Sequence, residues 1–260
     1  MAKYLISLIV LFCVVVVQVN AETKKGAPQA ELDAITARGR QLAEYDTASW
    51  NATDAVLATK PIRSRIGRYI AKKTESGWVV VFGKLNEQGD KFLIAYQATQ
   101  ETNPQTFTVA AFDPPQEDAG YFLNAEKAIE TALKVFQRQQ RPYNIAVLPA
   151  EGAQMYVYIY PGSTKTGTYV LGGDARYLVS ADGTTIVENK QLHKAILEYS
   201  NNASPKAAVA GVHSHVLSEV PEDTDVLYVL TRKPAVPEYV STMSRVIYVI
   251  NVDGTISKAK

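Results

Sequence analysis

Two of the three histidines of the chain, His213 and His215, stand one residue apart at the end of an apolar run, residues 207–212. The run predicts a strand, and residues two apart on a strand project to the same face. Asp225 follows ten residues after His215, behind a proline and further acids, so a turn can bring its carboxylate back to the imidazoles. Two imidazoles and one carboxylate suit a three-ligand metal site with an open fourth position.

A structural interpretation of the same residues stays open. One histidine can lie at the rim of the core and hydrogen-bond a backbone group, while Asp223 or Asp225 caps a helix that begins near Pro221. Helix capping accounts for either acid alone. It does not account for two histidines on one strand face that are directed toward the same turn, so the metal interpretation is kept beside the structural one.

Other catalytic patterns are absent or weak. His193, the third histidine, follows a polar stretch without a carboxylate at an informative spacing, so a serine triad has little support. Residues 162–167 resemble a phosphate loop only superficially, because they lack its order of glycine and lysine and lie between predicted strands. No Gly-x-Gly-x-x-Gly follows a predicted strand, so a dinucleotide-binding fold is not supported.

The elements that would position the histidines are read from the spacing of apolar residues. Helical spacing predicts a long helix that begins at Glu31 and ends before Pro61, and a second helix over residues 125–139. Alternating patterns over residues 78–83 and 91–97 predict a β-hairpin, and further strands follow the second helix. We therefore expect an α+β fold with a largely antiparallel mixed sheet and two main helices.

The first residues of the chain, 1–21, predict a secretory signal peptide. Lys3 precedes a short apolar run, and small residues at Val19 and Ala21 suit cleavage after Ala21. The run is short for a membrane-spanning helix, which needs about 20 apolar residues, and an uncleaved anchor is the alternative. We expect a periplasmic or secreted protein without a stable membrane span, and without disulfides because cleavage removes the only cysteine, Cys13.

The stretch Asp113–Asp118 contains two prolines and three acids and predicts a linker. It divides the mature chain into an N-terminal α+β portion, residues 22–116, which holds the long helix and the hairpin, and a second domain, residues 117–260. The chain has 27 basic and 26 acidic residues. This balance gives no reason to expect nucleic acid or an anionic membrane as a partner.

The segment around His213 and His215 resembles the metal motif of the JAB/JAMM metalloprotease family. In that motif His-x-His is followed, after a spacer, by Pro-Ser-x-x-Asp at the start of a helix, and Asp225 takes the place of the Asp. The resemblance covers roughly residues 120–258 and is closest to divergent JAB-like domains of secreted bacterial proteins. It implies a JAB-like fold for the C-terminal domain, with His213, His215 and Asp225 as ligands of a zinc ion.

The resemblance also implies a catalytic glutamate. Glu151 lies just ahead of the strand predicted over residues 155–160 and takes this role by position, with Glu188 as the alternative. Zinc lowers the pKa of a bound water to about 7, and Glu151 would take its proton and pass it to the leaving amine. The expected reaction is hydrolysis of an amide or peptide bond, with a peptide or protein as substrate.

Three departures from the family motif leave other functions open. The spacer is one residue shorter than usual, Val216 stands where a proline commonly follows the second histidine, and Glu222 replaces the serine. The second hypothesis is therefore a non-catalytic envelope protein that uses the same fold to bind a peptide or a protein partner. The third is an assembly factor in which the histidine pair is only packed.

Overall fold

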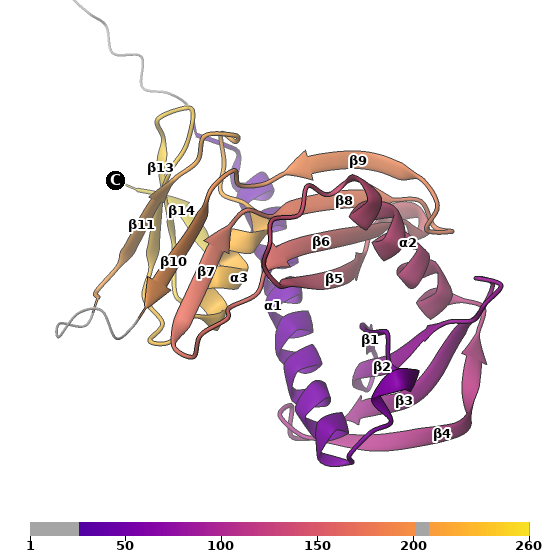
Figure 1. Ribbon diagram of the computed structural model, residues 1–260. Coiled ribbons are helices and arrows are strands. Elements are labelled where there is room, and N and C mark those ends of the chain that lie inside the picture. Colours follow the sequence, from indigo (N-terminus) through magenta and orange to yellow (C-terminus); the bar gives the residue numbers. More distant parts are fainter. Residues whose placement is uncertain (1–25, 201–207, 260) are drawn as a thin grey trace, which may run out of the picture.

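The computed structural model describes residues 26–200 and 208–259 of the chain. The signal peptide predicted over residues 1–21 lies outside the described residues. The protein has an α+β fold, as predicted, in which long antiparallel strands are combined with helices (Figure 1). Within the described ranges, no helix is both long enough and apolar enough to cross a membrane.

The helical elements are α1 (Gln29–Ala58), α2 (Tyr121–Val135) and α3 (Asp223–Thr231), with short 3-10 turns η1 (Arg63–Arg65) and η2 (Glu151–Ala153). The strands are β1 (Arg68–Thr74), β2 (Gly77–Leu85), β3 (Phe92–Gln100), β4 (Phe107–Asp118), β5 (Tyr143–Pro149), β6 (Met155–Pro161), β7 (Thr168–Gly172), β8 (Ala175–Val179), β9 (Ile186–Gln191), β10 (Ile196–Ser200), β11 (Gly211–Ser214), β12 (Glu238–Ser241), β13 (Ile247–Ile250) and β14 (Ile256–Lys258). The two long helices are those expected from the apolar spacing, and α3 begins two residues after Pro221.

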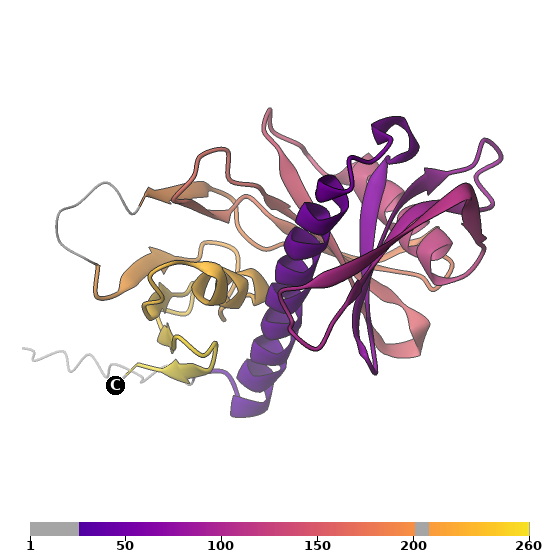
Figure 2. The ribbon, with the colours of Figure 1, turned by 90° about the horizontal axis from the view of Figure 1, so that it is seen from below.

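The strands of the described chain form four sheets. Two are antiparallel and four-stranded, in the orders β1-β2-β3-β4 and β5-β6-β8-β9, and β7 pairs with β10 as a ribbon. The fourth has the order β11-β12-β13-β14, and its β11–β12 pair is parallel. Figures 1 and 2 show α1 running between this last sheet, with α3, on one side and the two larger sheets on the other.

Helix α1 contributes to cores on both sides of it. Leu32 and Ile35, in its first turns, pack with α3 and the β11–β14 sheet. Further along, Leu42, Tyr45 and Val56 join a different core, formed with residues of β1–β3 and of β5 and β6. The apolar residues that predict this helix therefore pack against two different sets of elements, one after the other along the helix.

The boundary predicted at residue 116 falls inside a strand. The stretch Asp113–Asp118, expected to be a linker, is the second half of β4, and Gln116 pairs with Ile94 of β3. Proline is tolerated there because β4 is an edge strand. Core residues of α1 and of β5 and β6 belong to one cluster, so the N-terminal portion and the C-terminal domain share a hydrophobic core.

Gly39 explains how α1 approaches α3. A Cβ atom at this position would come within 2.4 Å of the Cβ of Val226 and 2.7 Å of the carbonyl oxygen of Asp223. These distances are too short for non-bonded atoms, so the two helices can cross this closely only over a glycine. The glycine weakens the helical pattern of the sequence, but it sets the position of α3 and of the acids at its start.

Candidate metal centre

His213 and His215 come from β11 and the residue after it. The strand pairs His213 with Val240 of β12, and the backbone N–H of His215 donates to the carbonyl oxygen of Ser241 at 2.7 Å. Side chains alternate as predicted: both imidazoles are buried, whereas Val212 on the other face is 68% exposed. The two rings are neighbours, with centroids 5.1 Å apart.

Asp225 lies in the first turn of α3 and is fully buried. Its Oδ2 atom accepts a hydrogen bond from the backbone N–H of Glu222 at 2.7 Å, as part of a capping box. The same oxygen lies 3.1 Å from Nε2 of His215. The helix-cap interpretation and the ligand interpretation therefore both apply to this one carboxylate, which its cap holds in place beside the imidazoles.

His193, which no sequence pattern assigned to the site, is the third imidazole of the cluster. It lies in the segment between β9 and β10, and its Nε2 atom is 2.9 Å from Nε2 of His215. Gly172 (φ +85°) admits this segment, because a Cβ there would lie 2.2 Å from the carbonyl oxygen of Ala195. His193 thus brings a fourth side chain to the predicted trio, beside which the sequence predicted an open fourth position.

The four side chains converge through their donor atoms. Nε2 of His213 is 3.2 Å from Nε2 of His215. Oδ1 of Asp225 is 3.0 Å from Nε2 of His193 and 3.1 Å from Nε2 of His213. All four donor atoms lie within 4.8 Å of one another. Ligands at 2.0–2.1 Å from a tetrahedral ion are separated by about 3.4 Å, so a small expansion of this cluster would accommodate one.

Each imidazole is oriented by a hydrogen bond on its far side. Nδ1 of His193 donates to Asp174 at 2.8 Å, and Nδ1 of His213 donates to Glu238 at 2.9 Å. Nδ1 of His215 lies 2.7 Å from Oγ of Ser218, whose own hydroxyl donates to a backbone carbonyl and therefore accepts from the ring. In the neutral rings these acceptors assign the proton to Nδ1 in all three, which leaves the Nε2 lone pairs directed at one another.

Converging lone pairs repel unless a cation lies between them. Burial opposes the charge of Asp225, yet the neighbouring imidazoles hold the pKa of its carboxyl well below the usual range. Burial likewise opposes an imidazolium, but Asp225 and Glu238 outweigh it and raise the pKa of His213 to about 9. Among the described residues, Oδ1 of Asp225 nevertheless has no hydrogen-bond partner. The cluster is thus a buried site built for positive charge, and it can hold a metal ion.

The residues that support the ligands are themselves fixed. Glu238 accepts from Nη1 of Arg232 at 2.9 Å through the carboxylate oxygen that does not face His213. Gly211 makes room for this pair, because a Cβ there would lie 1.8 Å from Oε2 of Glu238. Such a second layer of partners sets the ring orientation and tunes affinity in metal sites.

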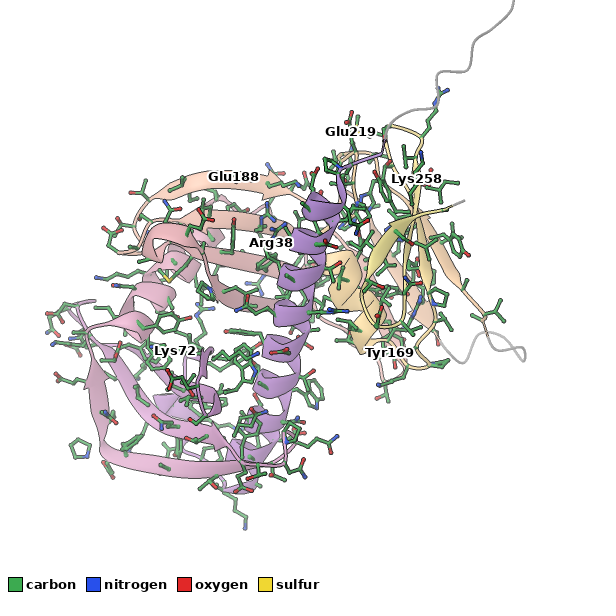
Figure 3. The ribbon with its side chains drawn as sticks, turned by 180° about the vertical axis from the view of Figure 1, so that it is seen from behind. Arg38, Lys72, Tyr169, Glu188, Glu219 and Lys258 are labelled. Atoms are coloured by element: carbon green, nitrogen blue, oxygen red, sulfur yellow. The ribbon has the colours of Figure 1, made fainter. Side chains whose placement is uncertain are left out.

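Asp223 ties the start of α3 to the rest of the fold. Its buried carboxylate pairs with Arg176 of β8 at 2.6 Å and with Arg38 of α1 at 3.0 Å, and it accepts from the hydroxyl of Tyr158 at 2.8 Å. Arg38, labelled in Figure 3, reaches α3 from α1. The position of Asp225, two residues further on, is therefore held by β6, β8 and α1 together.

The structure does not bring Glu151 to the cluster. It lies exposed in η2, which precedes Met155 at one end of β6, whereas Asp174 precedes Ala175, the partner of Ile159 at the other end. Glu188 is on the exposed edge strand β9 and pairs with Arg176 at 3.5 Å (Figure 3). Neither glutamate is among the groups that converge with the imidazoles.

No family model, no curated protein and no solved structure matches the chain in sequence or structure comparisons. The site is therefore described by its own geometry. His193 was missed because it is remote in sequence from the His-x-His pair, and its orienting carboxylate, Asp174, precedes it by more than a whole strand. The one available signal was the small number of histidines: all three meet at this point.

Proposed function

We propose that this is a zinc-binding protein that holds its ion in a closed site of four side chains, as a structural element of a non-catalytic binding fold. One observation carries the proposal: Nε2 of His193 lies 3.0 Å from Oδ1 of Asp225 and 2.9 Å from Nε2 of His215, so a fourth protein donor converges with the three predicted ligands. Catalytic zinc sites keep one position open, whereas structural sites close the tetrahedron with protein ligands.

The donor set favours zinc among the common metals. Three imidazole nitrogens and one carboxylate oxygen form a mixed N/O set that suits Zn²⁺ better than Mg²⁺ or Ca²⁺, which prefer oxygen ligands. A four-coordinate arrangement matches zinc's tetrahedral preference. In this site the ion would join three segments that are not continuous in sequence: the β9–β10 connection, β11 and α3. Zinc binding energy would then contribute directly to folding.

Hydrolysis of amide bonds is the alternative, and the resemblance of the His-x-His and Asp residues to the JAB/JAMM motif favours it. This alternative requires His193 to leave the ion and a carboxylate to reach the bound water. Glu151, the expected base, lies beyond the far end of β6. Glu222, at the position of the family's serine, is engaged by Lys190 at 2.9 Å. A closed site therefore accounts for more of the contacts than an active one.

The predicted signal peptide extends the proposal to location and partners. An exported chain with a closed zinc site would act in the periplasm or outside the cell by presenting a surface to a peptide or protein partner. The balanced charge of the chain gives no support for nucleic acid as that partner.

Metal analysis of the purified mature chain tests the proposal. We expect about one zinc per chain by mass spectrometry, lost in His213→Ala/His215→Ala and retained in Ser214→Ala, whose side chain lies exposed between the two histidines. Wild-type protein without metal after growth with zinc would overturn the proposal.

Cobalt substitution separates a closed site from an open one. In Co²⁺-loaded wild type the visible spectrum should not change when azide is added, because no coordination position is free. In Co²⁺-loaded His193→Ala azide should change the spectrum. An azide response of the wild type, together with zinc-dependent cleavage of amide substrates, would favour the hydrolase instead.

A further inference from the structure

A second polar cavity lies next to the metal centre and shares Asp174 with it. The cavity has a volume of about 120 Å³ and lies among α1, β6, β7 and α3. Asp174 lines it, while Oδ1 of the same residue accepts from His193. The other lining groups that bear on its chemistry are Asp46, Tyr160, Tyr169, Tyr228 and Thr224.

One acid of this lining, Asp46, has no counterion among the described residues. Asp46 of α1 accepts one hydrogen bond, from the hydroxyl of Tyr160 at 2.7 Å, and no ion pair of Asp46 occurs among the described residues. The described residues that line the cavity include no Lys or Arg. Burial raises the pKa of Asp46, and the Tyr160 hydrogen bond offsets this only in part. A cationic ligand would compensate the half-buried carboxylate of Asp46.

Thr224 supplies a second, independent indication of a ligand. It lines the cavity, it is only 3% exposed, and its hydroxyl has no hydrogen-bond partner in the part of the chain that the structure describes. A buried hydroxyl left without a partner costs free energy, and native proteins rarely retain one without a water or a ligand. A ligand that donates hydrogen bonds in several directions would satisfy Thr224 and Asp46 together.

Aromatic rings complete the lining. Tyr160 and Tyr169 contribute to the cavity, and Tyr169 is labelled on β7 in Figure 3. Tyr228 also lines it, but the guanidinium of Arg232 already lies over its ring at 4.7 Å. Tyrosine rings attract cations through their negatively polarised faces. The combination of carboxylate, hydroxyls and aromatic rings is suited to an ammonium group, which is compact, carries three donors and has no acceptor.

We propose that this cavity binds a primary ammonium group, either of a small free amine or of a lysine side chain. The volume exceeds what one water needs but is far below that of a pocket for a drug-sized ligand, so only the end of a larger molecule could enter. The proposal does not depend on the metal centre being structural or catalytic, because Asp46 and Thr224 are not metal ligands.

Binding of defined probes to the full mature chain with its metal tests the proposal. Ethylammonium represents a free amine, and Nα-acetyl-lysine methylamide represents a lysine side chain. Ethanol and Nα-acetyl-norleucine methylamide are their uncharged counterparts. Backbone NMR signals of cavity residues should shift saturably with at least one charged probe. Because so small a probe makes few contacts, its dissociation constant should be on the order of 1–10 mM. The uncharged counterparts should bind at least about tenfold more weakly.

Variants assign the binding to the cavity. Asp46→Asn should lower the affinity for the charged probe at least about tenfold. Thr224→Val, which removes only the hydroxyl, should lower this affinity severalfold. Asp54→Asn, an exposed acid further along the same helix, should bind as wild type does. Circular dichroism and metal content report whether each variant is folded.

Three results would overturn the proposal. The first is equal binding of the charged and uncharged probes. The second is unchanged binding by folded Asp46→Asn. The third is no saturable shift for either amine at concentrations up to about 100 mM, well above the expected range. Binding by the lysine derivative but not by ethylammonium would assign the cavity to protein lysines, and the converse would assign it to free amines.

Discussion

Nε2 of His193 lies 3.0 Å from Oδ1 of Asp225. The first residue belongs to the connection between β9 and β10, and the second belongs to the first turn of α3. The contact adds a fourth side chain to the cluster of His213, His215 and Asp225.

Asp174→Asn should lower zinc affinity by 10- to 100-fold without loss of the fold. Asp174 accepts the Nδ1–H of His193 at 2.8 Å, and orienting partners of metal-bound histidines typically contribute that much. Competition with a chromophoric chelator measures the affinity. Asp182→Asn, in the exposed turn at the opposite end of β8, is the matched control. Equal affinity of the two variants would mean that Asp174 does not orient a ligand.

Asp223→Asn should destabilise the protein by about 3–5 kcal/mol, because it leaves Arg38 and Arg176 without their shared buried counter-charge. Urea unfolding followed by circular dichroism measures the change. Glu44→Gln, which removes the exposed ion pair with Lys73, should change stability by less than about 1 kcal/mol. A loss below 1 kcal/mol in Asp223→Asn would show that water replaces the carboxylate in this network.

Gly39→Ala should destabilise the protein even though alanine has the higher helix propensity. The added Cβ would meet Val226 at 2.4 Å and must push α1 and α3 apart, at a cost of about 1–3 kcal/mol or more. Thr47→Ala, at an exposed position of the same helix, should stabilise by a few tenths of a kcal/mol. Thermal unfolding compares the two. A gain of stability in Gly39→Ala would contradict the close helix crossing.

The contribution of Asp46 to stability should depend on pH. Burial raises its pKa in the folded chain above the ordinary 3.8, so the folded state holds this proton more tightly than the unfolded state. Stability is then highest while Asp46 is protonated and falls as pH rises through and above 3.8. Asp46→Asn lacks this loss, so its stability relative to wild type should increase with pH.

Urea unfolding between about pH 3 and pH 7, with chelator present throughout, measures this difference free of metal binding. Asp182→Asn supplies a control of opposite sign. Hydrogen bonds from Ser180 and Thr184 lower the pKa of Asp182, so its stabilisation is present at higher pH and is lost on acidification. A difference between Asp46→Asn and wild type that does not change with pH would refute the prediction.

The sequence predicted the α+β class, both long helices and the helix start after Pro221, because each rests on local spacing and capping preferences. It also brought His213, His215 and Asp225 together, since strand alternation and a short turn are local rules. His193 and Glu151 could not be placed in the same way. Their positions depend on how β6 and β8 pair and on which end of each strand meets α3, and such long-range pairing leaves no periodic signal in one sequence.

The predicted linker shows the same limit. Proline and acids over Asp113–Asp118 favour a loop, but an edge strand tolerates them because one side of its backbone needs no partner. Gly39 is the reverse case: an unfavourable helix residue is retained because of a tertiary contact with Val226. In both places packing between remote segments outweighs local preference.

Helix α1 contributes apolar side chains to the core beside α3 and to the core between the larger sheets. Loss of the helix would therefore expose both cores at once, and neither half of the chain retains a complete interior without it. Unfolding should accordingly be a single cooperative transition in which the histidine cluster unfolds together with the N-terminal sheet. A shortened chain that begins after residue 116 would lack one wall of its own core, so cutting the protein at that point would yield an aggregating fragment rather than an isolated domain.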